Sequence, residues 1–434
     1  MSRSRSERHA EGVSFERSMS DNGKSIAAPM NAVRRSEKPL ACVIGGIDLV
    51  RALALAHIRS AVVAKEGEVS RYSRFTAAVL DARDPWSDAE RLVDRLLRFA
   101  DSQRERPVLY YDGDGSLLLV SRYRERLQDA FRFVVPESEL VEELTDKARF
   151  QPLAERVGLP VPHSVVLSTR GSPAPSAIDL PFPLVLKPRA RPMARWRPLG
   201  AGAKAVRVDT PAALREMWPR IAELGVEVLA QELVPGPESC IESYHAYIDG
   251  EGETVGEFTG RKIRTHPPEC GYSTAVAVTT ADDVAEVGRD VLRRLDLRGV
   301  AKCDFKRGPD GRLHLLEINA RFNLWHHPGA KAGVNLPALV YADLVGLPRE
   351  SSPRARAGVR WCTLPDDARA ARQAGVPLRR WLWWAFGCET KWAFAWDDPM
   401  PFVRGVVGPR LSRLLRFRRR RRPAVEQTAV RAGG

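Results

Sequence analysis

The chain has 434 residues, of which 44% are apolar and 28% are charged, a composition typical of a globular protein with two or three domains. Its net charge of +14 is concentrated at the ends, because residues 404–434 hold ten arginines and one glutamate and residues 1–38 hold eight basic and five acidic residues. The central part is close to neutral, which argues against the broad basic face of a nucleic-acid reader, so we expect no specific nucleic-acid partner.

The six cysteines are scattered, without a CxxC pair or a metal-ligand spacing, which is typical of thiols in a reducing compartment. The N-terminus lacks the apolar segment of a secretory signal, and no apolar run is long enough to span a membrane. We therefore expect a cytoplasmic protein.

Residues 1–38 are polar and show no periodicity, which predicts a disordered leader. An apolar strand run then ends at Gly45-Gly46 and is followed by a helical pattern. The same order of strand, turn and helix recurs in VLYY, DGDGS and LLLVSRYRERLQDAF. These two units predict a Rossmann-like α/β domain over residues 39–140. The glycine pair does not match GxGxxG, so a tight turn without a ligand is an equally good interpretation.

The following segment predicts an α+β domain. ELTDKARFQPLAERVGL is interpreted as a helix that ends at Gly158, and FPLVLKP as a strand that ends at Lys187-Pro188. The loop LGAGAKA contains Gly200, Gly202 and Lys204. Glycines let backbone N–H groups approach phosphates, although most such loops are only turns. The motifs GxxxxGK[ST], GxSxG and HExxH do not occur, which excludes a P-loop and leaves serine-hydrolase and zincin functions without support.

In HLLEINARF, polar and apolar side chains alternate, so a strand here would have one apolar and one polar face. The apolar residues are Leu316, Ile318 and Ala320, and the polar ones are Glu317, Asn319 and Arg321. Taken alone, a half-buried strand with a solvated polar face is the commoner case. However, the run AKCDFK also alternates, and the turn signal RGPDG lies between the two runs, which predicts a β-hairpin.

Such a hairpin would bring Asp304 close to Glu317 and Asn319, although the register cannot be predicted. Two carboxylates and an amide oxygen are hard ligands that suit Mg²⁺. Because Mg²⁺ fills its other positions with water and phosphates, the hairpin indicates a nucleotide site.

The order of DKARF, LKP, the glycine–lysine loop, QELVPGPE, CDF and LLEINARF resembles the ATP-grasp superfamily. Within it, the chain looks like the carboxylate–amine ligases related to D-aspartate ligase, D-alanine–D-alanine ligase and the pyrrolysine-pathway ligase. The resemblance covers about residues 40–346. It implies a fold of α/β and α+β parts, with a Rossmann-like (pre-ATP-grasp) domain at 39–140, a two-lobed ATP-grasp domain at 141–346 and a C-terminal extension.

The resemblance also implies the roles of individual residues. Those implied for ATP are the phosphate-contacting Lys147 and Lys187, the closing-loop residues Gly200, Gly202 and Lys204, the adenine-binding Gln231, Glu232 and Val234, and the ribose-binding Glu238. Those implied for Mg²⁺, with Mn²⁺ as the alternative ion, are Asp304, Glu317 and Asn319. Arg321 would steady an acyl phosphate. Lys302 stands where relatives often have an arginine, and lysine cannot make a bidentate contact.

These residue types suit an ATP-dependent ligase that joins a small-molecule carboxylate to an amine. Phosphorylation of the carboxylate makes an acyl phosphate, which the amine attacks, and the protein contributes mainly positioning and charge neutralisation. One alternative is an ATP-grasp enzyme that phosphorylates bicarbonate or carbamate, although the chain has no biotin-carrier or glutaminase segment. The other is a nucleotide-binding scaffold without catalysis.

Basic residues suggest an anionic substrate. Arg261, Lys262 and Arg264 correspond to a region that relatives use near the acceptor substrate, although a solvated basic hairpin is equally consistent with the pattern. The loop RARPMARWRPLG adds four arginines that would extend the anionic site or lie in solvent: Arg189, Arg191, Arg195 and Arg197.

The C-terminal part contains a Trp-rich extension at 347–403 and an Arg-rich tail at 404–434. Aromatic clusters are usually core, and an Arg-rich tail can simply add solubility. Arginines beside Trp and Leu also suit peripheral contact with an anionic membrane, at its inner face. Because relatives are often dimers, a homodimer is a further hypothesis.

Overall fold

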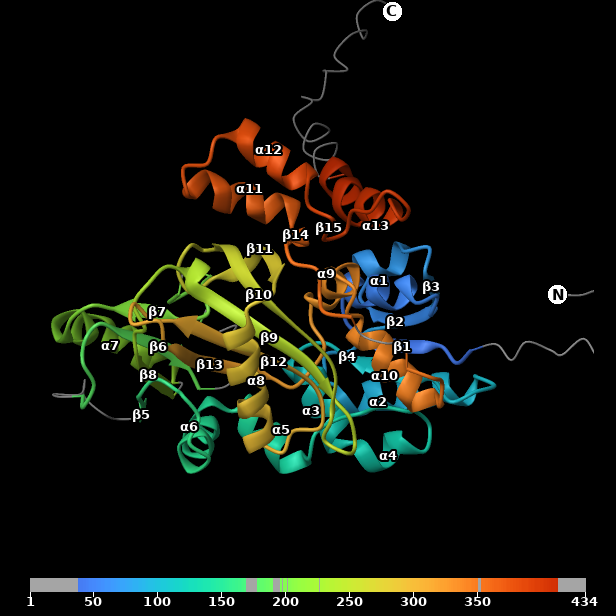
Figure 1. Ribbon diagram of the computed structural model, residues 1–434, viewed down its shortest axis with the longest axis horizontal. Coiled ribbons are helices and arrows are strands. Elements are labelled where there is room, and N and C mark those ends of the chain that lie inside the picture. The colour runs from blue at the N-terminus through green and yellow to red at the C-terminus, as the bar shows by residue number, and fades with distance from the viewer. Residues whose placement is uncertain are drawn as a thin grey trace, which may run out of the picture. The chain divides into compact units, whose positions relative to one another are not determined.

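The computed structural model describes residues 38–168, 178–189, 196, 198–200, 202–225, 227–349 and 353–412, which build three β-sheets and the helices around them (Figure 1). The predicted leader up to residue 37, the tail beyond Ser412 and three loop arginines, Arg191, Arg195 and Arg197, lie outside the described residues.

The first sheet is parallel and has the strand order β3-β2-β1-β4. Strands β1, β2 and β4 are buried along their whole length, as expected where helices cover both faces of a parallel sheet. The predicted α/β fold of this part is therefore confirmed. Its elements are β1 (Ala41–Ile44), α1 (Ile47–Leu55), β2 (Ser60–Ala64), η1 (Val69–Tyr72), β3 (Thr76–Asp81), α2 (Ala89–Asp101), β4 (Val108–Tyr111), α3 (Asp114–Arg122) and α4 (Arg124–Gln128).

The predicted helix over ELTDKARFQPLAERVGL is two helices, α5 (Ser138–Thr145) and α6 (Lys147–Arg156). The chain leaves the helical conformation at Asp146, whose carboxylate accepts a hydrogen bond from the backbone N–H of Ala148 at 2.8 Å. An aspartate in this position caps a new helix, which explains the break. The predicted end holds, because Gly158 follows α6 with φ of +68°, a conformation that favours glycine.

The second sheet is antiparallel and has the order β5-β8-β6-β7. Helix α7 packs on it through a core that includes Leu186, Trp218 and Ile221. Its elements are β5 (Ser164–Leu167), β6 (Leu184–Pro188), β7 (Val206–Val208), α7 (Pro211–Leu224) and β8 (Val228–Glu232).

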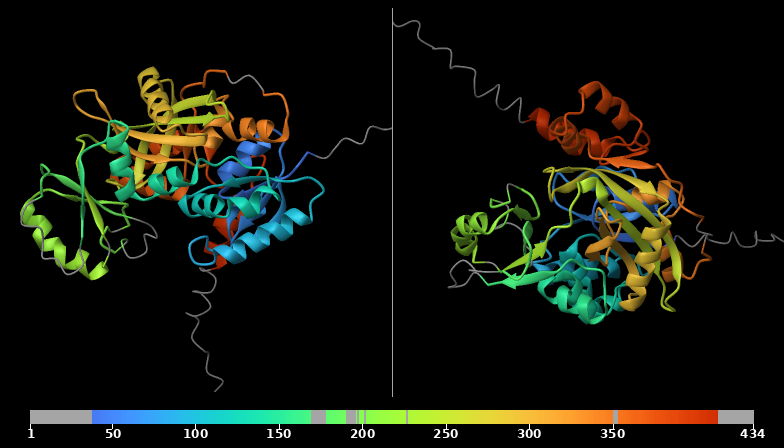
Figure 2. Two further views of the ribbon diagram at one scale, coloured as in Figure 1. Left: turned by 90° about the horizontal axis from the view of Figure 1, so that it is seen from below. Right: turned by 60° about the vertical axis from the view of Figure 1, so that its left-hand side comes forward.

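The third sheet has seven strands in the order β13-β12-β9-β10-β11-β14-β15, all antiparallel except for the last pair. Figure 2 shows its long strands from two further sides. The predicted hairpin is its edge, formed by β12 and β13. Its elements, in chain order, are η2 (Glu238–Cys240), β9 (Ile241–Ile248), β10 (Thr254–His266), β11 (Tyr272–Thr279), α8 (Asp282–Arg294), β12 (Gly299–Arg307), β13 (Leu313–Asn319), α9 (His326–Lys331), α10 (Leu336–Val345), β14 (Arg360–Cys362) and β15 (Thr390–Lys391).

One detail of the hairpin prediction is wrong. Asp304 pairs with Glu317 but the next residue, Phe305, pairs with Leu315, so Leu316 is the extra residue of a β-bulge. The bulge shifts the alternation by one residue. Leu315 therefore packs in the core, whereas Leu316 lies on the cavity described below.

The C-terminal extension packs on the third sheet and on helix α1 of the first sheet's layer. Strands β14 and β15 join the third sheet, and buried Arg51 of α1 donates hydrogen bonds of 3.1 to 3.2 Å to the carbonyls of Lys391, Ala393 and Asp398. Because an unpaired guanidinium would be costly there, these contacts hold the extension in place. Its helical elements are α11 (Leu364–Gln373), α12 (Leu378–Phe386), α13 (Met400–Phe402) and the π-helical turn η3 (Val403–Val407). Within the described residues, every helix is too short or too polar to cross a bilayer.

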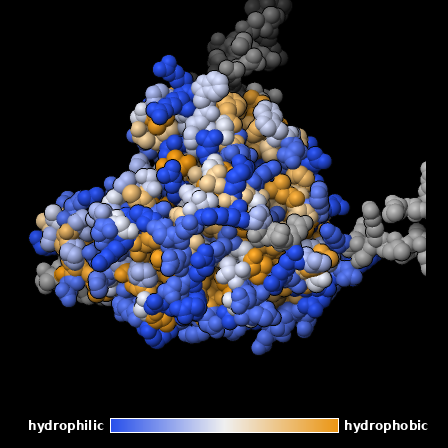
Figure 3. Space-filling model, in the orientation of Figure 1, coloured by the Kyte–Doolittle hydropathy of each residue, from blue (hydrophilic) through white to orange (hydrophobic). Residues whose placement is uncertain are grey.

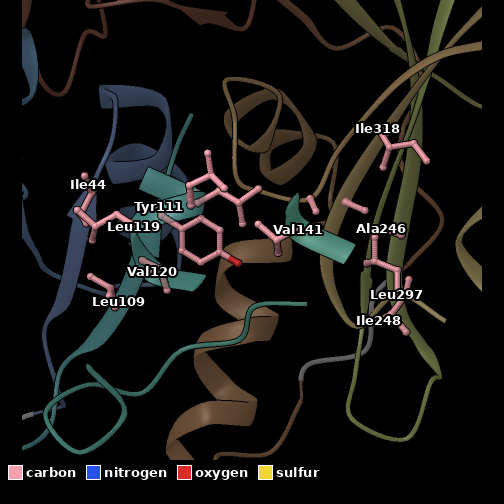
Figure 4. Packing of buried hydrophobic residues seen from close by; sticks show 14 of the residues in the cluster. Ile44, Leu109, Tyr111, Leu119, Val120, Val141, Ala246, Ile248, Leu297 and Ile318 are labelled. Carbon is pink, nitrogen blue, oxygen red and sulfur yellow. The ribbon is translucent and has the colours of Figure 1, made fainter. Parts of the chain in front are cut away.

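A continuous apolar core joins the first and third sheets. Figure 4 shows Tyr111 and Leu119 of the first sheet's layer, Val141 of α5, and Ala246 and Ile318 of the third sheet within one cluster. Since this core crosses residue 140, the predicted domain boundaries stay predictions. The packing positions the end of β13 against the turn that follows β4.

Candidate active site

A cavity of about 180 Å³ lies between the second and third sheets, at the start of α6 and beside α3. Eleven of the predicted site residues line it: Lys147, Lys187, Lys204, Gln231, Glu232, Val234, Glu238, Lys262, Asp304, Glu317 and Asn319. The first and last of them, Lys147 and Asn319, are more than 170 positions apart in the sequence, so the fold brings together most of the predicted set.

The hairpin places the two carboxylates side by side. Asp304 and Glu317 are directly opposite each other across β12 and β13, and Lys302 is opposite Asn319. Asp304 is buried, accepts a hydrogen bond from the hydroxyl of Ser243, and forms an ion pair with Lys302 Nζ at 2.6 Å. The amide of Asn319 donates to Glu317 Oε1 at 3.1 Å. The result is the polar sheet face that the sequence pattern predicted.

This oxygen set fits Mg²⁺ in its chemistry, because the ion takes few protein ligands and prefers carboxylate and amide oxygens. The described residues contain no group of three His, Cys, Asp or Glu side chains that could hold a metal ion, so the candidate set has two carboxylates and one amide. Lys302 contacts Asp304, and Arg321 Nη2 donates to Asn319 Oδ1 at 2.8 Å. An ion that used these oxygens would have to displace both cations.

Lysines surround the carboxylates. Burial alone would raise the pKa of Glu317, but Lys204, Lys302 and Lys262 outweigh it and hold the pKa well below its usual range. Burial lowers the pKa of Lys187 and of Lys204 to about 8, against the attraction of Glu317. Several ammonium groups in one buried cavity repel one another, and a polyanion would relieve that repulsion.

The part of the cavity beside β6 and β8 is more apolar. Val185 and Leu229 line it, and Lys187 Nζ donates to Gln231 Oε1 at 2.6 Å. The backbone N–H of Glu232 donates to the carbonyl of His163 at 2.9 Å, so this group is already used within the fold. The predicted contact of the Glu232 backbone with adenine stays a prediction.

Two aspartates that lie close to Arg321 were not predicted from the sequence. Arg321 Nε donates to Asp114 Oδ1 at 2.6 Å, and Arg321 Nη1 lies 3.9 Å from Asp112 Oδ1. Burial opposes the charge of Arg321, but Asp114 and Asp112 raise its pKa. Both aspartates belong to DGDGS after β4, and the carboxyl end of a parallel strand is the usual place for functional side chains. That position was the signal that could have found them.

The Gly45-Gly46 turn supports one of these aspartates. The backbone N–H of Gly46 donates to Asp112 Oδ2 at 3.4 Å, and a Cβ at Gly45 would lie 2.6 Å from the Cβ of Asp112. The glycines of this turn therefore give room to the side chain of Asp112.

No protein-family model matches the chain. The curated proteins that match it in sequence include two amino-acid ligases. D-aspartate ligase of Enterococcus faecium (strain Aus0004) is 24% identical over 265 residues, which cover 58% of this chain and 63% of that protein. D-alanine–D-alanine ligase of Ectopseudomonas mendocina (strain ymp) is 23% identical over 217 residues, covering 46% of this chain and 64% of that protein. The chain thus spans less than two thirds of the length of either relative.

The solved structures that match the fold include two enzymes. An ADP complex of N5-carboxyaminoimidazole ribonucleotide synthetase has a TM-score of 0.57 at 17% identity, covering 74% of this chain and 80% of that one. L-amino acid ligase from Bacillus licheniformis has a TM-score of 0.56 at 16% identity, covering 75% and 78%. The chain has the ATP-grasp fold. It is also a distant homologue of D-aspartate ligase and D-alanine–D-alanine ligase.

The glycine–lysine loop lies at one side of the cavity between the second and third sheets, which we call the ATP-grasp cavity. Gly202 has φ of +89°, and a Cβ at Gly200 would lie 2.8 Å from the carbonyl oxygen of Ala203, so both positions favour glycine. Lys204 lines the cavity and its ammonium lies 4.7 Å from the ring centroid of Tyr272. Gly200 and Gly202 do not line the cavity themselves.

The three basic residues predicted for the substrate site, all on β10, lie in three different environments. Lys262 is buried and lines the ATP-grasp cavity, whereas Arg261 is exposed and outside its lining. Arg264 forms a paired hydrogen bond with Asp367 at 2.6 and 2.7 Å and stacks on Trp384 at 4.1 Å. A register shift between Lys262 and Arg264 explains the different orientation. Of the three predicted substrate residues, the fold brings only Lys262 to the cavity.

A different contact holds Arg189. Its guanidinium donates to Asp146 at 3.1 to 3.2 Å and to Glu227 at 2.5 Å. The first of these carboxylates also caps α6, whose first residue is Lys147. Arg189 therefore braces the start of α6 against the second sheet and does not line the cavity.

Proposed function

We propose that the chain is an ATP-dependent ligase that joins a small-molecule carboxylate to an amine and releases ADP and phosphate. The observation that carries the proposal is the pair Asp304 and Glu317, adjacent across the β12–β13 hairpin, in a cavity lined by lysines. Buried carboxylates ringed by cations suit a site for a metal-bound polyphosphate. The distant homology to two amino-acid ligases supports the same reaction class.

In this proposal ATP lies between the second and third sheets. Lys147 and Lys187 would neutralise its phosphates, Val185 and Leu229 would pack against the adenine, and Glu238 would hold the ribose. Asp304, Glu317 and Asn319 would hold Mg²⁺ or Mn²⁺, which when bound neutralises phosphate charge. Lys204 would contact the phosphates from the glycine loop, where a closed loop would also exclude water.

The reaction has two steps. A carboxylate oxygen of the first substrate attacks the γ-phosphorus, the bond to ADP breaks, and an acyl phosphate forms. The amine nitrogen then attacks the acyl carbon, phosphate leaves with the bonding electron pair, and the amine loses a proton to solvent. Arg321, held by Asp114, would place a fixed positive charge beside the acyl phosphate, and Lys302, once displaced from Asp304 by the ion, would add a second one.

Lys262 suggests the class of substrate. Its ammonium is buried in the cavity near Glu317, and a buried cation needs a compensating anion. We therefore propose that a substrate with a negatively charged group binds there. Arg261 and Arg264, which lie elsewhere, are not part of this proposal.

The test is Mg²⁺-dependent release of ADP by the full chain, with amino acids and small carboxylates offered singly and in pairs. Glu317→Ala is the inactive variant, and Glu66→Ala, at an exposed position of the first sheet's layer, is the matched control. We expect ADP only when an acid and an amine are both present, and none from Glu317→Ala. ADP release that needs bicarbonate and no acid–amine pair would favour a carboxylate-phosphorylating enzyme instead. ATP binding without ADP release in any mixture would favour a nucleotide-binding scaffold.

A further inference from the structure

The C-terminal extension carries apolar side chains on its outside. Trp383 is 83% exposed and Trp396 is 82% exposed, which is unusual for the largest apolar side chain. We define the C-terminal apolar surface by its exposed residues: Leu378, Leu382, Trp383, Phe386, Trp396, Met400, Val403, Val407 and Leu411. In Figure 3, these segments lie at the top, where pale and orange residues alternate with blue ones.

This exposure follows the geometry of the helices. Helix α12 buries Trp381 and Ala385 against β11 and β14, and these residues form its inner, core-facing side. Leu378, Leu382 and Phe386 follow at intervals of four residues and form a separate stripe. An ordinary surface helix has one apolar stripe, and a second exposed one indicates another partner.

The segment Met400–Leu411 repeats the pattern. Its inner side packs on the first sheet's layer, where Val406 is buried and Gly405 lies against Val69. The exposed apolar residues are spaced by three or four positions, as on one side of a helix: Met400, Val403, Val407 and Leu411. In Figure 1, α12 and α13 both lie at the top of the molecule, above the third sheet and the first sheet's layer.

Positive charge frames the surface. Arg379 and Arg380 on α12 and Arg404 and Arg410 beyond α13 are exposed, and neither α12 nor residues 399–412 contain an acidic residue. Of the acids nearby, Asp398 is buried with Arg51, Glu389 accepts from the backbone N–H of Arg360, and Asp397 is exposed next to Trp396. The sequence continues beyond Ser412 with eight arginines and one glutamate in 22 residues.

These features discriminate between partners. A second copy would bring mainly arginines against arginines, because the four exposed arginines outnumber the one exposed acid beside them, Asp397. A nucleic acid would satisfy the arginines and leave the aliphatic side chains exposed. An anionic bilayer satisfies both, since its headgroups bind arginine and its interfacial region accepts Trp, Phe and Leu. We propose that α12 and Met400–Leu411 dock the protein on an anionic lipid surface, with Trp383, Phe386 and Trp396 inserted at the interface.

The test is flotation of the full chain with vesicles of phosphatidylcholine, with and without 30% phosphatidylglycerol (about a third anionic lipid). We expect binding to the anionic vesicles and roughly tenfold less binding to the neutral ones. Trp383→Ala/Phe386→Ala/Trp396→Ala should abolish flotation without loss of folding, because these side chains are largely exposed. Trp86→Ala, which changes an exposed Trp in the first sheet's layer, should float like the unchanged protein.

A charge-reversal pair tests the arginines. Arg379→Glu/Arg380→Glu should weaken anionic-vesicle binding about tenfold, and Arg215→Glu/Arg220→Glu, the same charge change on exposed positions of α7, should not. Unchanged flotation of the triple alanine variant would overturn the proposal. So would flotation that is lost only when serine replaces the five arginines at 418–422, or a triple variant whose sole effect is to dissociate a dimer in ultracentrifugation. The assay contains no nucleotide, so its failure leaves the proposed ligase untouched.

Discussion

The β12–β13 hairpin and the C-terminal apolar surface depart from the usual distribution of side chains in opposite directions. In the hairpin, Asp304 is 2% exposed and lies among charged groups, whereas on α12, Trp383 is 83% exposed. Buried charges lose hydration on folding, and an apolar side chain that stays exposed contributes almost nothing to the free energy of folding. The comparison teaches that the stability of the fold explains neither region, and that each is a separate candidate for function.

The largest expected effect is on the carboxylate pair. Asp304→Asn keeps the shape and the contact with Ser243 but removes the charge, so we expect ADP release to fall by about 10²- to 10³-fold. Asp310→Asn, in the exposed turn of the same hairpin, is the control and should retain activity. Steady-state rates of ADP release by both variants measure this effect. Equal rates would contradict a metal-binding role for Asp304.

A smaller loss is expected at the positioning residue Asp114. Asp114→Asn keeps an oxygen that can accept from Arg321 but removes the charge that holds the guanidinium, and we expect kcat to fall about ten- to a hundredfold. The KM for ATP should change little, because Arg321 is proposed to act on the acyl phosphate. Asp129→Asn, at an exposed position after α4, is the matched control. A change in KM alone would contradict the proposed role.

We expect the affinity for ATP to depend on pH through Lys187. The pKa of Lys187 is lowered to about 8, so its ammonium loses its proton as the pH rises through 8, and the attraction to phosphate is lost. We expect the Kd for ATP to rise roughly tenfold between pH 7 and pH 9, because a group one unit above its pKa is about nine-tenths neutral. Calorimetric titration measures this. In Lys187→Arg the rise should be smaller, since arginine stays charged; an identical rise would exclude Lys187 as the titrating group.

The smallest effect is expected from the exposed tryptophan. Trp383→Ala should change the free energy of unfolding by no more than about 0.5 kcal/mol, as for other surface substitutions. Trp381→Ala, two residues earlier on the same helix but buried, should cost about 3–5 kcal/mol. Urea unfolding of both variants measures the difference. A large loss of stability in Trp383→Ala would indicate that its side chain stabilises the fold. The contrast between this surface and the hairpin would then disappear.

Local patterns predicted much of the site. The alternation in HLLEINARF and AKCDFK, with RGPDG between them, predicted the hairpin and the shared face of Asp304, Glu317 and Asn319, because these preferences act between near neighbours. The strand–turn–helix units predicted the α/β part for the same reason. The β-bulge at Leu316 was not predicted, since a bulge depends on the fit between two strands and leaves no clear sign in either one.

What the sequence by itself determined about this protein is therefore the set of elements and the chemical character of their faces: strands that alternate, turns at Gly and Pro, and lysines at strand ends. Only the tertiary structure decided which distant residues meet. Arg321 reaches Asp114 across 207 positions, and Arg264 turns to Asp367 across 103 positions instead of facing the cavity. It also decided that Trp381 is buried while Trp383 is exposed. The physical reason is that pairing of charges and burial of side chains depend on the packing of whole sheets and helices, whereas periodicity reports only on the chain's nearest neighbours.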